Sequence, residues 1–226
     1  MDGSTAHERP TRPRFTVLDP PSAPQTMSES PLPSREEALA LMESWTASES
    51  LRKHMLAVEA AMRSYARHYG EDEHRWALAG LLHDFDYERF PNAAQAADAE
   101  HPSEGVRHLR TLGYPDDICT AILGHALFTG VARETRMAKV LFAVDELCGL
   151  ITAAALVRPS RSVMDLEATS VKKKMKDKAF ARGVSRDDVL NCAADLGVEL
   201  EQHIAFVIEA MRGSASALGL AGPSLS

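Results

Sequence analysis

The sequence predicts an all-α domain, a compact bundle of many helices. Apolar residues recur at the three- and four-residue spacing of a helix that buries one face, and this pattern is found in one segment after another. No stretch alternates apolar and polar residues as a half-buried strand does, and no Asn-Gly or Asp-Gly turn joins two such stretches. Hydrophobic residues make up 45% of the 226 residues, which is enough for a buried core.

The chain divides into three parts by composition. Residues 1–33 contain seven prolines among scattered Ser and Thr, a composition that cannot bury a core. We therefore expect 1–33 to be a disordered, Pro-rich tail, 34–212 to form one helical domain, and 213–226 to be a frayed C-terminal tail. The predicted helices, in chain order, cover about residues 35–45, 50–69, 73–85, 101–113, 115–125, 135–157, 162–178, 185–196 and 199–212.

The first helices are predicted from residues that are typical of helix starts and helix ends. Ser34 followed by Glu37 fits a capping box, which predicts a helix start at this point. Gly70 is a typical residue to end the second helix. The third helix contains the apolar run Trp76–Leu82, and the mixed composition of 86–100 predicts a loop after it.

Proline and glycine also delimit the later helices. Pro102 is acceptable in the first turn of a helix, and Gly113 is a suitable end for it. Pro115 starts the next helix in the same way. The segment 135–157 is the most apolar of the chain and ends before Pro159. Shorter helices close the domain.

The charge balance limits the classes of function. Acidic residues outnumber basic ones by 32 to 25, a net charge of −7, which argues against a general nucleic-acid or membrane-surface binder. A local site can still invert this sign for an anionic substrate. Three widely spaced cysteines predict reduced thiols, and neither a membrane span nor a signal peptide is apparent. We expect a cytoplasmic protein, and a homodimer through the apolar C-terminal helices is left open.

Six polar side chains lie on apolar helix faces or at helix ends, where a buried polar group needs a partner. They are His54, His83, Asp84, His101, His125 and Asp145. A lone histidine on an apolar face is more often an ordinary core residue. Asp145 is more telling, because it lies within the apolar stretch Leu141–Leu147, where an unpaired carboxylate is costly and a metal-bound one is not. The histidines in polar surroundings are predicted to lie at the surface: His68, His74, His108 and His203.

The order of these residues, His then His-Asp then His, His and Asp, resembles the HD-domain superfamily of metal-dependent phosphohydrolases over about residues 50–150. The resemblance implies a multi-helix fold and a metal site in which Asp84 bridges two ions. It assigns one ion to His54, His83 and Asp145, and the other to His101 and His125. It also implies a phosphomonoesterase or phosphodiesterase that acts on a small phosphorylated substrate, of which a nucleotide is one candidate.

The ligand types agree with this chemistry. Imidazole and carboxylate without thiolate favour Mn, Fe, Co, Ni or Zn, with Mg also compatible, and either one or two ions. Two ions about 3.5–4 Å apart would clamp a phosphoryl oxygen and lower the pKa of a bridging water, so that hydroxide attacks phosphorus. No GxSxG or GxxxxGK[ST] motif supplies another nucleophile or phosphate loop.

Further residues are candidates for catalysis and substrate binding. The catalytic candidates are His83, Asp84 and Glu88, the last of which would orient the attacking water. The stretch Asp86–Arg89 is otherwise a lid, a hydrogen-bond partner of a ligand, or a polar loop. The candidates to bind the anionic substrate are Lys139, Arg133, Arg158 and Lys173. The last of these belongs to the basic run 172–178, which is more often a solvated helix face than a phosphate-attracting wall.

Two other functions fit the same ligand set. Some proteins of the HD fold are mixed-valent di-iron oxygenases, and six ligands of type His4Asp2 suit both chemistries. A non-catalytic regulatory domain with a vestigial site is the third interpretation, against which the intact ligand set argues.

Overall fold

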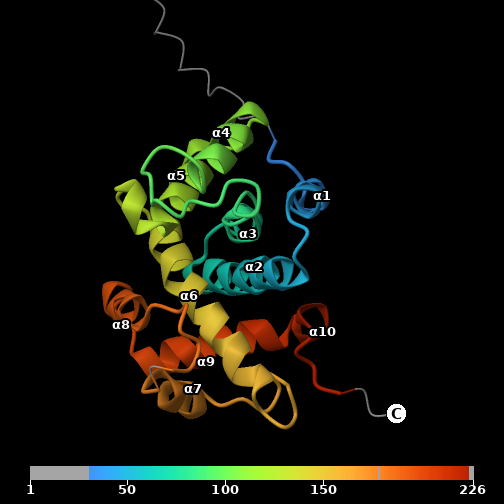
Figure 1. Ribbon diagram of the computed structural model, residues 1–226, viewed down its shortest axis with the longest axis vertical. Helices are drawn as coiled ribbons and strands as arrows, with labels where there is room; N and C mark the ends of the chain where they lie inside the picture. The colour runs from blue at the N-terminus through green and yellow to red at the C-terminus, as the bar shows by residue number, and fades with distance from the viewer. Residues whose placement is uncertain (1–30, 178, 224–226) are drawn as a thin grey trace, which may run out of the picture. The chain divides into compact units, whose positions relative to one another are not determined.

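The computed structural model describes residues 31–177 and 179–223, and within these ranges the chain forms helices and no strand. The predicted all-α class is confirmed (Figure 1). The helices are α1 (Arg35–Trp45), α2 (Glu49–Tyr69), α3 (Glu73–Leu82), α4 (Ser103–Thr111), α5 (Asp116–His125), the 3-10 turn η1 (Leu127–Thr129), α6 (Arg136–Leu156), α7 (Ala168–Met175), α8 (Arg186–Asp195), α9 (Leu200–Arg212) and α10 (Ala215–Leu218). The tail predicted over 1–33 falls mainly on residues outside the described ranges. Among the described helices, none has the length and apolar character that a membrane crossing requires.

The helix ends follow the local chemistry predicted from the sequence. The Ser34 hydroxyl accepts the Glu37 N–H at 3.2 Å, and the Glu37 carboxylate accepts the Ser34 N–H at 2.7 Å, which completes the capping box of α1. Helix α2 ends at Gly70, whose φ of 70° is a left-handed conformation that glycine adopts without strain. At the start of α2 the Ser48 hydroxyl accepts the Leu51 N–H at 3.3 Å, so α2, which carries His54, is capped at both ends.

Helices α2 and α3 cross closely at Gly80. A Cβ atom at this position would lie 2.9 Å from Met62 Cγ and 3.0 Å from the backbone N of Glu59, so a larger side chain would force the two helices apart. Because α3 ends at Leu82, this close crossing brings the residues that follow it next to α2.

Helix α6 passes through the middle of the fold. It packs against α2 and α5, which carry other candidate ligands, and against α7, α8 and α9 (Figure 1). Val144, Leu147 and Cys148 are fully buried beside Asp145, which remains partly exposed. The most apolar helix therefore delivers a carboxylate to the edge of the core.

Three predicted boundaries need correction. Helix α3 stops at Leu82, so His83 and Asp84 lie in the turn that follows it. The segment 162–167 is not helical, and α7 begins at Ala168. The segment 213–226 is not a frayed tail in its described part: α10 packs on α2 and α9, and Leu220 is buried. The errors at 162–167 and after residue 212 have one cause. The Val163 N–H donates to the Leu220 carbonyl at 2.9 Å, so these two segments order each other by a contact between distant parts of the chain.

Candidate metal centre

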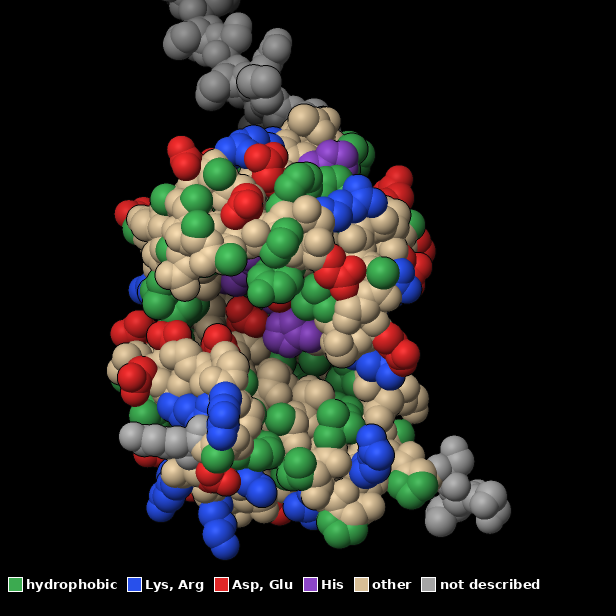
Figure 2. Space-filling view, viewed as in Figure 1, with side chains coloured by type: hydrophobic (Ala, Val, Ile, Leu, Met, Phe, Trp, Pro, Cys, Tyr) green, Lys and Arg blue, Asp and Glu red, His purple; other side chains and the backbone are tan. Residues whose placement is uncertain are grey.

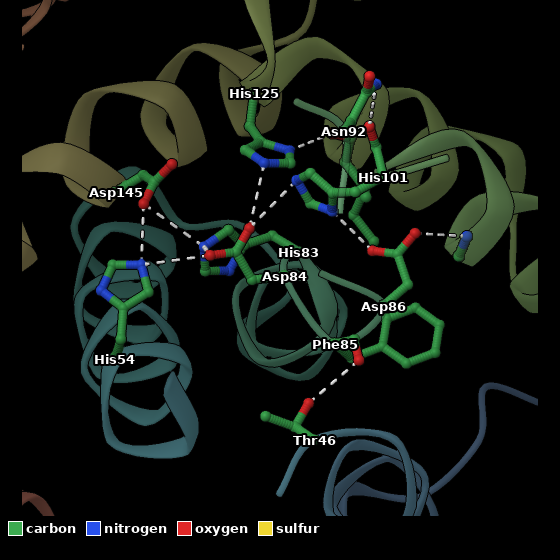
Figure 3. Close-up of polar contacts among 12 residues, drawn as sticks. Thr46, His54, His83, Asp84, Phe85, Asp86, Asn92, His101, His125 and Asp145 are labelled. Carbon is green, nitrogen blue, oxygen red and sulfur yellow. Dashed lines mark hydrogen bonds and ion pairs between the residues drawn. The ribbon is translucent and has the colours of Figure 1, made fainter. Parts of the chain in front are cut away.

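Six side chains from five parts of the fold meet in one place (Figure 3). His54 comes from the second turn of α2, and His83 and Asp84 follow the end of α3. His101 precedes α4, His125 is the last residue of α5, and Asp145 lies in the middle of α6. They form two groups, in each of which one ligand atom per residue lies within 4.8 Å of the others: His54, His83 and Asp145 in the first, and Asp84, His101 and His125 in the second.

The first group is centred on Asp145. Its Oδ1 atom lies 2.9 Å from His54 Nε2 and 3.4 Å from His83 Nε2. Two ligands about 2.1 Å from a shared ion, at tetrahedral or octahedral angles, lie about 3.0–3.4 Å apart. The spacing in this group therefore suits a common divalent ion.

Asp84 connects the two groups. Its Oδ1 atom lies 3.4 Å from His101 Nε2 and 3.4 Å from His125 Nε2, within the second group. Its Oδ2 atom faces the first group, 3.5 Å from His83 Nε2 and 3.8 Å from His54 Nε2. A carboxylate with one oxygen toward each group is placed to bridge two ions.

Two of the histidines are fixed by the helix ends on which they lie. The Nδ1–H of His83 donates to the Gly80 carbonyl at 2.8 Å, and the Nδ1–H of His125 donates to the Ile122 carbonyl. Carbonyls in the last turn of a helix lack a partner within the helix, so each histidine satisfies one of them. With Nδ1 holding the proton, Nε2 of the neutral ring is left with a free lone pair.

A third histidine is fixed by a buried carboxylate. His101 Nδ1 lies 2.7 Å from Asp86 Oδ1, and the other oxygen of Asp86 accepts the Gly105 N–H at 2.7 Å. Asp86 is 1% exposed. A Cβ atom at Gly105 would lie 2.6 Å from Asp86 Cγ, so glycine is required for the carboxylate to fit. Of the alternatives for the stretch Asp86–Arg89, the hydrogen-bond partner of a ligand is the one that Asp86 adopts.

The protonation of the cluster follows from its charges. Burial would lower the pKa of His83, but the Asp84 and Asp145 carboxylates raise it well above its ordinary value. Burial would raise the pKa of Asp84, yet His83 and His125 hold it well below its ordinary range. The pKa of Asp145 is lowered by His83 and His54 in the same way, against the effect of burial. Protons on His83 and His125, whose pKa values are both raised, therefore help to balance the two carboxylates when no ion is bound.

The residues present fit a divalent metal ion. His83 Nε2 is buried and has no hydrogen-bond partner within the described ranges, although it points between two carboxylate oxygens. Either a proton directed at these oxygens or a metal ion must therefore occupy the space beside this buried nitrogen. Four imidazoles and two carboxylates are the donor types that bind first-row divalent ions.

Glu88 contacts the backbone of another part of the fold. Its two carboxylate oxygens accept the backbone N–H groups of Ala47 and Ser48, at 2.6 and 2.8 Å. These amides lie at the start of α2, and Ser48 is the N-cap residue of that helix. The carboxylate thus joins the turn after α3 to the start of α2, which favours a structural role, and the orientation of a water by Glu88 stays a prediction.

Three of the four predicted substrate-binding residues lie elsewhere. Arg158 pairs with Asp165 at 2.8 Å and lies beyond the end of α6, thirteen residues after Asp145. Lys139 precedes Asp145 by six residues, which turns it about 120° away on the helix, and it lines a separate hollow with Glu134. Lys173 is exposed on α7.

Arg133 remains beside the cluster. It donates to the Gly124 carbonyl at 3.2 Å, and Gly124 directly precedes His125. Its guanidinium carbon lies 3.9 Å from the centre of the Phe142 ring, one helical turn before Asp145. Of the four predicted residues, Arg133 is thus the one whose contacts adjoin a candidate ligand along the chain, and its binding of an anion stays a prediction.

One histidine was wrongly expected at the surface. His203 is 1% exposed, accepts the Tyr65 hydroxyl at Nδ1 and donates from Nε2 to the Ala143 carbonyl at 3.2 Å. Burial lowers the pKa of His203, so its ring is held neutral inside the fold. The apolar residues that follow it, Ile204 and Phe206, were the signal in the sequence.

Comparison with known proteins adds one finding. Residues 51–150 match the family model described as HD domain, and this segment contains all six residues of the two groups. No curated protein and no solved structure matches the chain.

Proposed function

Through residues 51–150 the chain belongs to the HD-domain family, whose members are metal-dependent phosphohydrolases. From this membership we propose that the protein hydrolyses a phosphate ester with the help of two divalent ions. His54, His83 and Asp145 would hold one ion, His101 and His125 the other, and Asp84 would bind both. The observation that supports this most is the orientation of Asp84, whose two oxygens face different groups at 3.4–3.8 Å.

The protein's own residues prepare the site for ions and an anion. Because the Nδ1–H groups of His83, His101 and His125 are already bonded, each Nε2 is directed into the site. When bound, two ions would polarise the phosphoryl oxygens and lower the pKa of a water. Asp84 and Asp145 together carry two negative charges, so two divalent ions leave the site positive and able to attract a phosphate group. Arg133 would add a further positive charge beside His125.

The donor set also bears on the metal. Four imidazoles favour Mn, Fe, Co, Ni or Zn over the oxygen-rich sites that Mg and Ca prefer. We propose that the working ions belong to the first-row group.

The test is an activity screen of the metal-reconstituted protein. The ion-free chain is loaded in turn with Mn, Fe, Co, Ni, Zn and Mg, and phosphate release is measured on phosphomonoesters, cyclic nucleotides and other diesters. We expect turnover that requires the metal and proceeds equally well without oxygen. No turnover with any metal on any ester would contradict the proposal.

The same screen separates the two other functions. A di-iron oxygenase would retain iron tightly, show redox-active absorption bands and require oxygen for turnover. A regulatory domain would bind metal and turn over no substrate under any condition.

A further inference from the structure

A basic hollow lies next to the candidate metal centre. It has a volume of about 540 Å³ and is formed by the end of α7 with Lys176, by residues 182–185 and by the start of α8. Its lining carries three positive side chains, Lys176, Arg182 and Arg186, and one negative side chain, Asp187. This local excess of positive charge contrasts with the whole chain, which has a net charge of −7.

The hollow adjoins the first ligand group through α6. Ser185, which lines the hollow, donates its backbone N–H to the Glu146 carboxylate at 3.2 Å, and Glu146 directly follows Asp145. Val184, also in the lining, lies 3.7 Å from the point where a Cβ of Gly149 would be, one helical turn beyond Asp145. In Figure 2, His and Asp or Glu side chains border one side of a hollowed region, and Lys and Arg side chains lie on the other side.

The three positive residues do not have the same role. The Arg186 guanidinium donates to the carbonyls of Ala181 and Val184, both at 2.6 Å, and to that of Phe180, so it holds the loop before α8 in shape. The side chains of Lys176 and Arg182 are exposed and have no hydrogen-bond or ion-pair partner in the described part of the chain. They are therefore free to bind a ligand, while Arg186 is occupied by the backbone.

We propose that this hollow binds a second anionic group of the substrate, so that the substrate is a phosphate ester that also carries another phosphate or a carboxylate. This inference rests on the proposed function. The ester phosphate would lie at the ions, and Lys176 and Arg182 would bind the distant anion. Arginine suits the planar, two-point recognition of either group, and lysine adds a mobile positive charge.

The test measures binding with phosphonates, which cannot be hydrolysed. Alkylphosphonates with spacers of increasing length carry a hydroxyl, a carboxylate or a second phosphonate at the far end. Their affinities for the Mn-loaded protein are measured by calorimetry. At one spacer length we expect a charged end group to improve affinity about tenfold over the hydroxyl, as a charge-assisted hydrogen bond would. The two charged series distinguish phosphate from carboxylate.

Variants link this gain to the hollow. In the double variant Lys176→Ala, Arg182→Ala we expect the gain to fall below about twofold, with the hydroxyl series unchanged, because substitutions of exposed side chains seldom disturb folding. Lys173→Ala is the matched control, since Lys173 is exposed on α7 but does not line the hollow. The inference is overturned if the wild type gains nothing at any spacer length, or if the gain survives in the double variant. Phosphate release from simple monoesters, measured separately, tests the proposed function itself.

Discussion

The histidines of the cluster show how single residues serve both folding and chemistry. His83 and His125 each donate to the carbonyl three residues earlier, so the group that ends the helix also directs Nε2 into the site. The sequence could single out the six candidate ligands, because each lies on an apolar helix face or at a helix end. The sequence could not assign the hydrogen-bond partners of Asp86 and Glu88, because side chains two residues apart in a turn can point in unrelated directions.

Among single residues, substitution of one metal-ligand side chain should abolish metal binding. We expect His83→Ala or Asp84→Ala to lose the ions and the activity while the helices remain formed, because either change removes a donor that the fold holds in place. Metal content after desalting measures the loss, and far-ultraviolet circular dichroism monitors the helices. Full activity in either variant would show that the ligand assignment is wrong.

The Asp86 carboxylate should matter to one ion more than to the other. In Asp86→Asn, the amide cannot accept both the His101 and Gly105 N–H groups, so His101 loses its fixed orientation. We expect a loss of about 10–100-fold in affinity for the ion held by His101 and His125, the usual effect of removing such a partner. Titration of the ion-free protein with Mn gives both affinities.

Glycine variants supply the control for this prediction. Gly105→Ala places a Cβ 2.6 Å from Asp86 Cγ and should weaken the same ion, whereas Gly149→Ala meets Val184 at an ordinary 3.7 Å and should not. Equal losses for both ions in Asp86→Asn would mean that Asp86 supports the fold as a whole.

At the scale of elements, the linkers position the site as much as the helices do. The Thr46 hydroxyl donates to the Phe85 carbonyl at 3.0 Å, and Glu88 binds the amides of Ala47 and Ser48. The turn after α3 is thus bound to the linker between α1 and α2. The sequence predicted most helix ends from capping residues, but it missed the ordered segment around Leu220, because that order depends on a contact with Val163 far along the chain.

The role of Glu88 can be tested at this scale. Glu88→Gln removes the negative charge from two backbone N–H groups near the start of α2, and we expect it to lower the free energy of unfolding by about 1–2 kcal/mol. Because Glu88 stabilises a linker, kcat should be unchanged. Urea unfolding and steady-state kinetics measure the two quantities. A large fall in kcat at unchanged stability would favour the catalytic interpretation instead.

For the whole molecule, the charges of the cluster couple stability to pH and to metal. The raised pKa values of His83 and His125 mean that, without ions, these residues stabilise the fold at low pH and cease to do so as pH rises through the raised values. The lowered pKa values of Asp84 and Asp145 have the opposite sign: their stabilisation is lost only as pH falls below the ordinary carboxylate range.

The ion-free protein should therefore lose thermal stability on the alkaline side. We expect its unfolding temperature to fall as pH rises above 6.5, the ordinary pKa of histidine, because deprotonated rings no longer balance the two carboxylates. The metal-loaded protein should not show this fall, since the ions replace the protons. The measurement is the unfolding temperature of both forms as a function of pH above 6.5. If the two forms lost thermal stability equally over this pH range, the proposed balance of charges in the cluster would be contradicted.

The basic hollow is also a property of the whole fold. The sequence showed a run of lysines on one segment, but Arg182 joins Lys176 only because residues 182–185 lie against α6, where Ser185 donates to Glu146. No spacing along the chain predicts this pairing. The all-α class and the six candidate ligands followed from patterns in the sequence, whereas the surroundings of the candidate site depend on tertiary contacts.

The central claim is that two ions, shared by Asp84, carry out the hydrolysis of a phosphate ester. The most direct test follows phosphate release while the ion-free protein is titrated with metal, and plots activity against equivalents of metal per chain. We predict that activity rises until two equivalents are bound and is small at one. Full activity at a single equivalent, or none at any ratio, would contradict the claim.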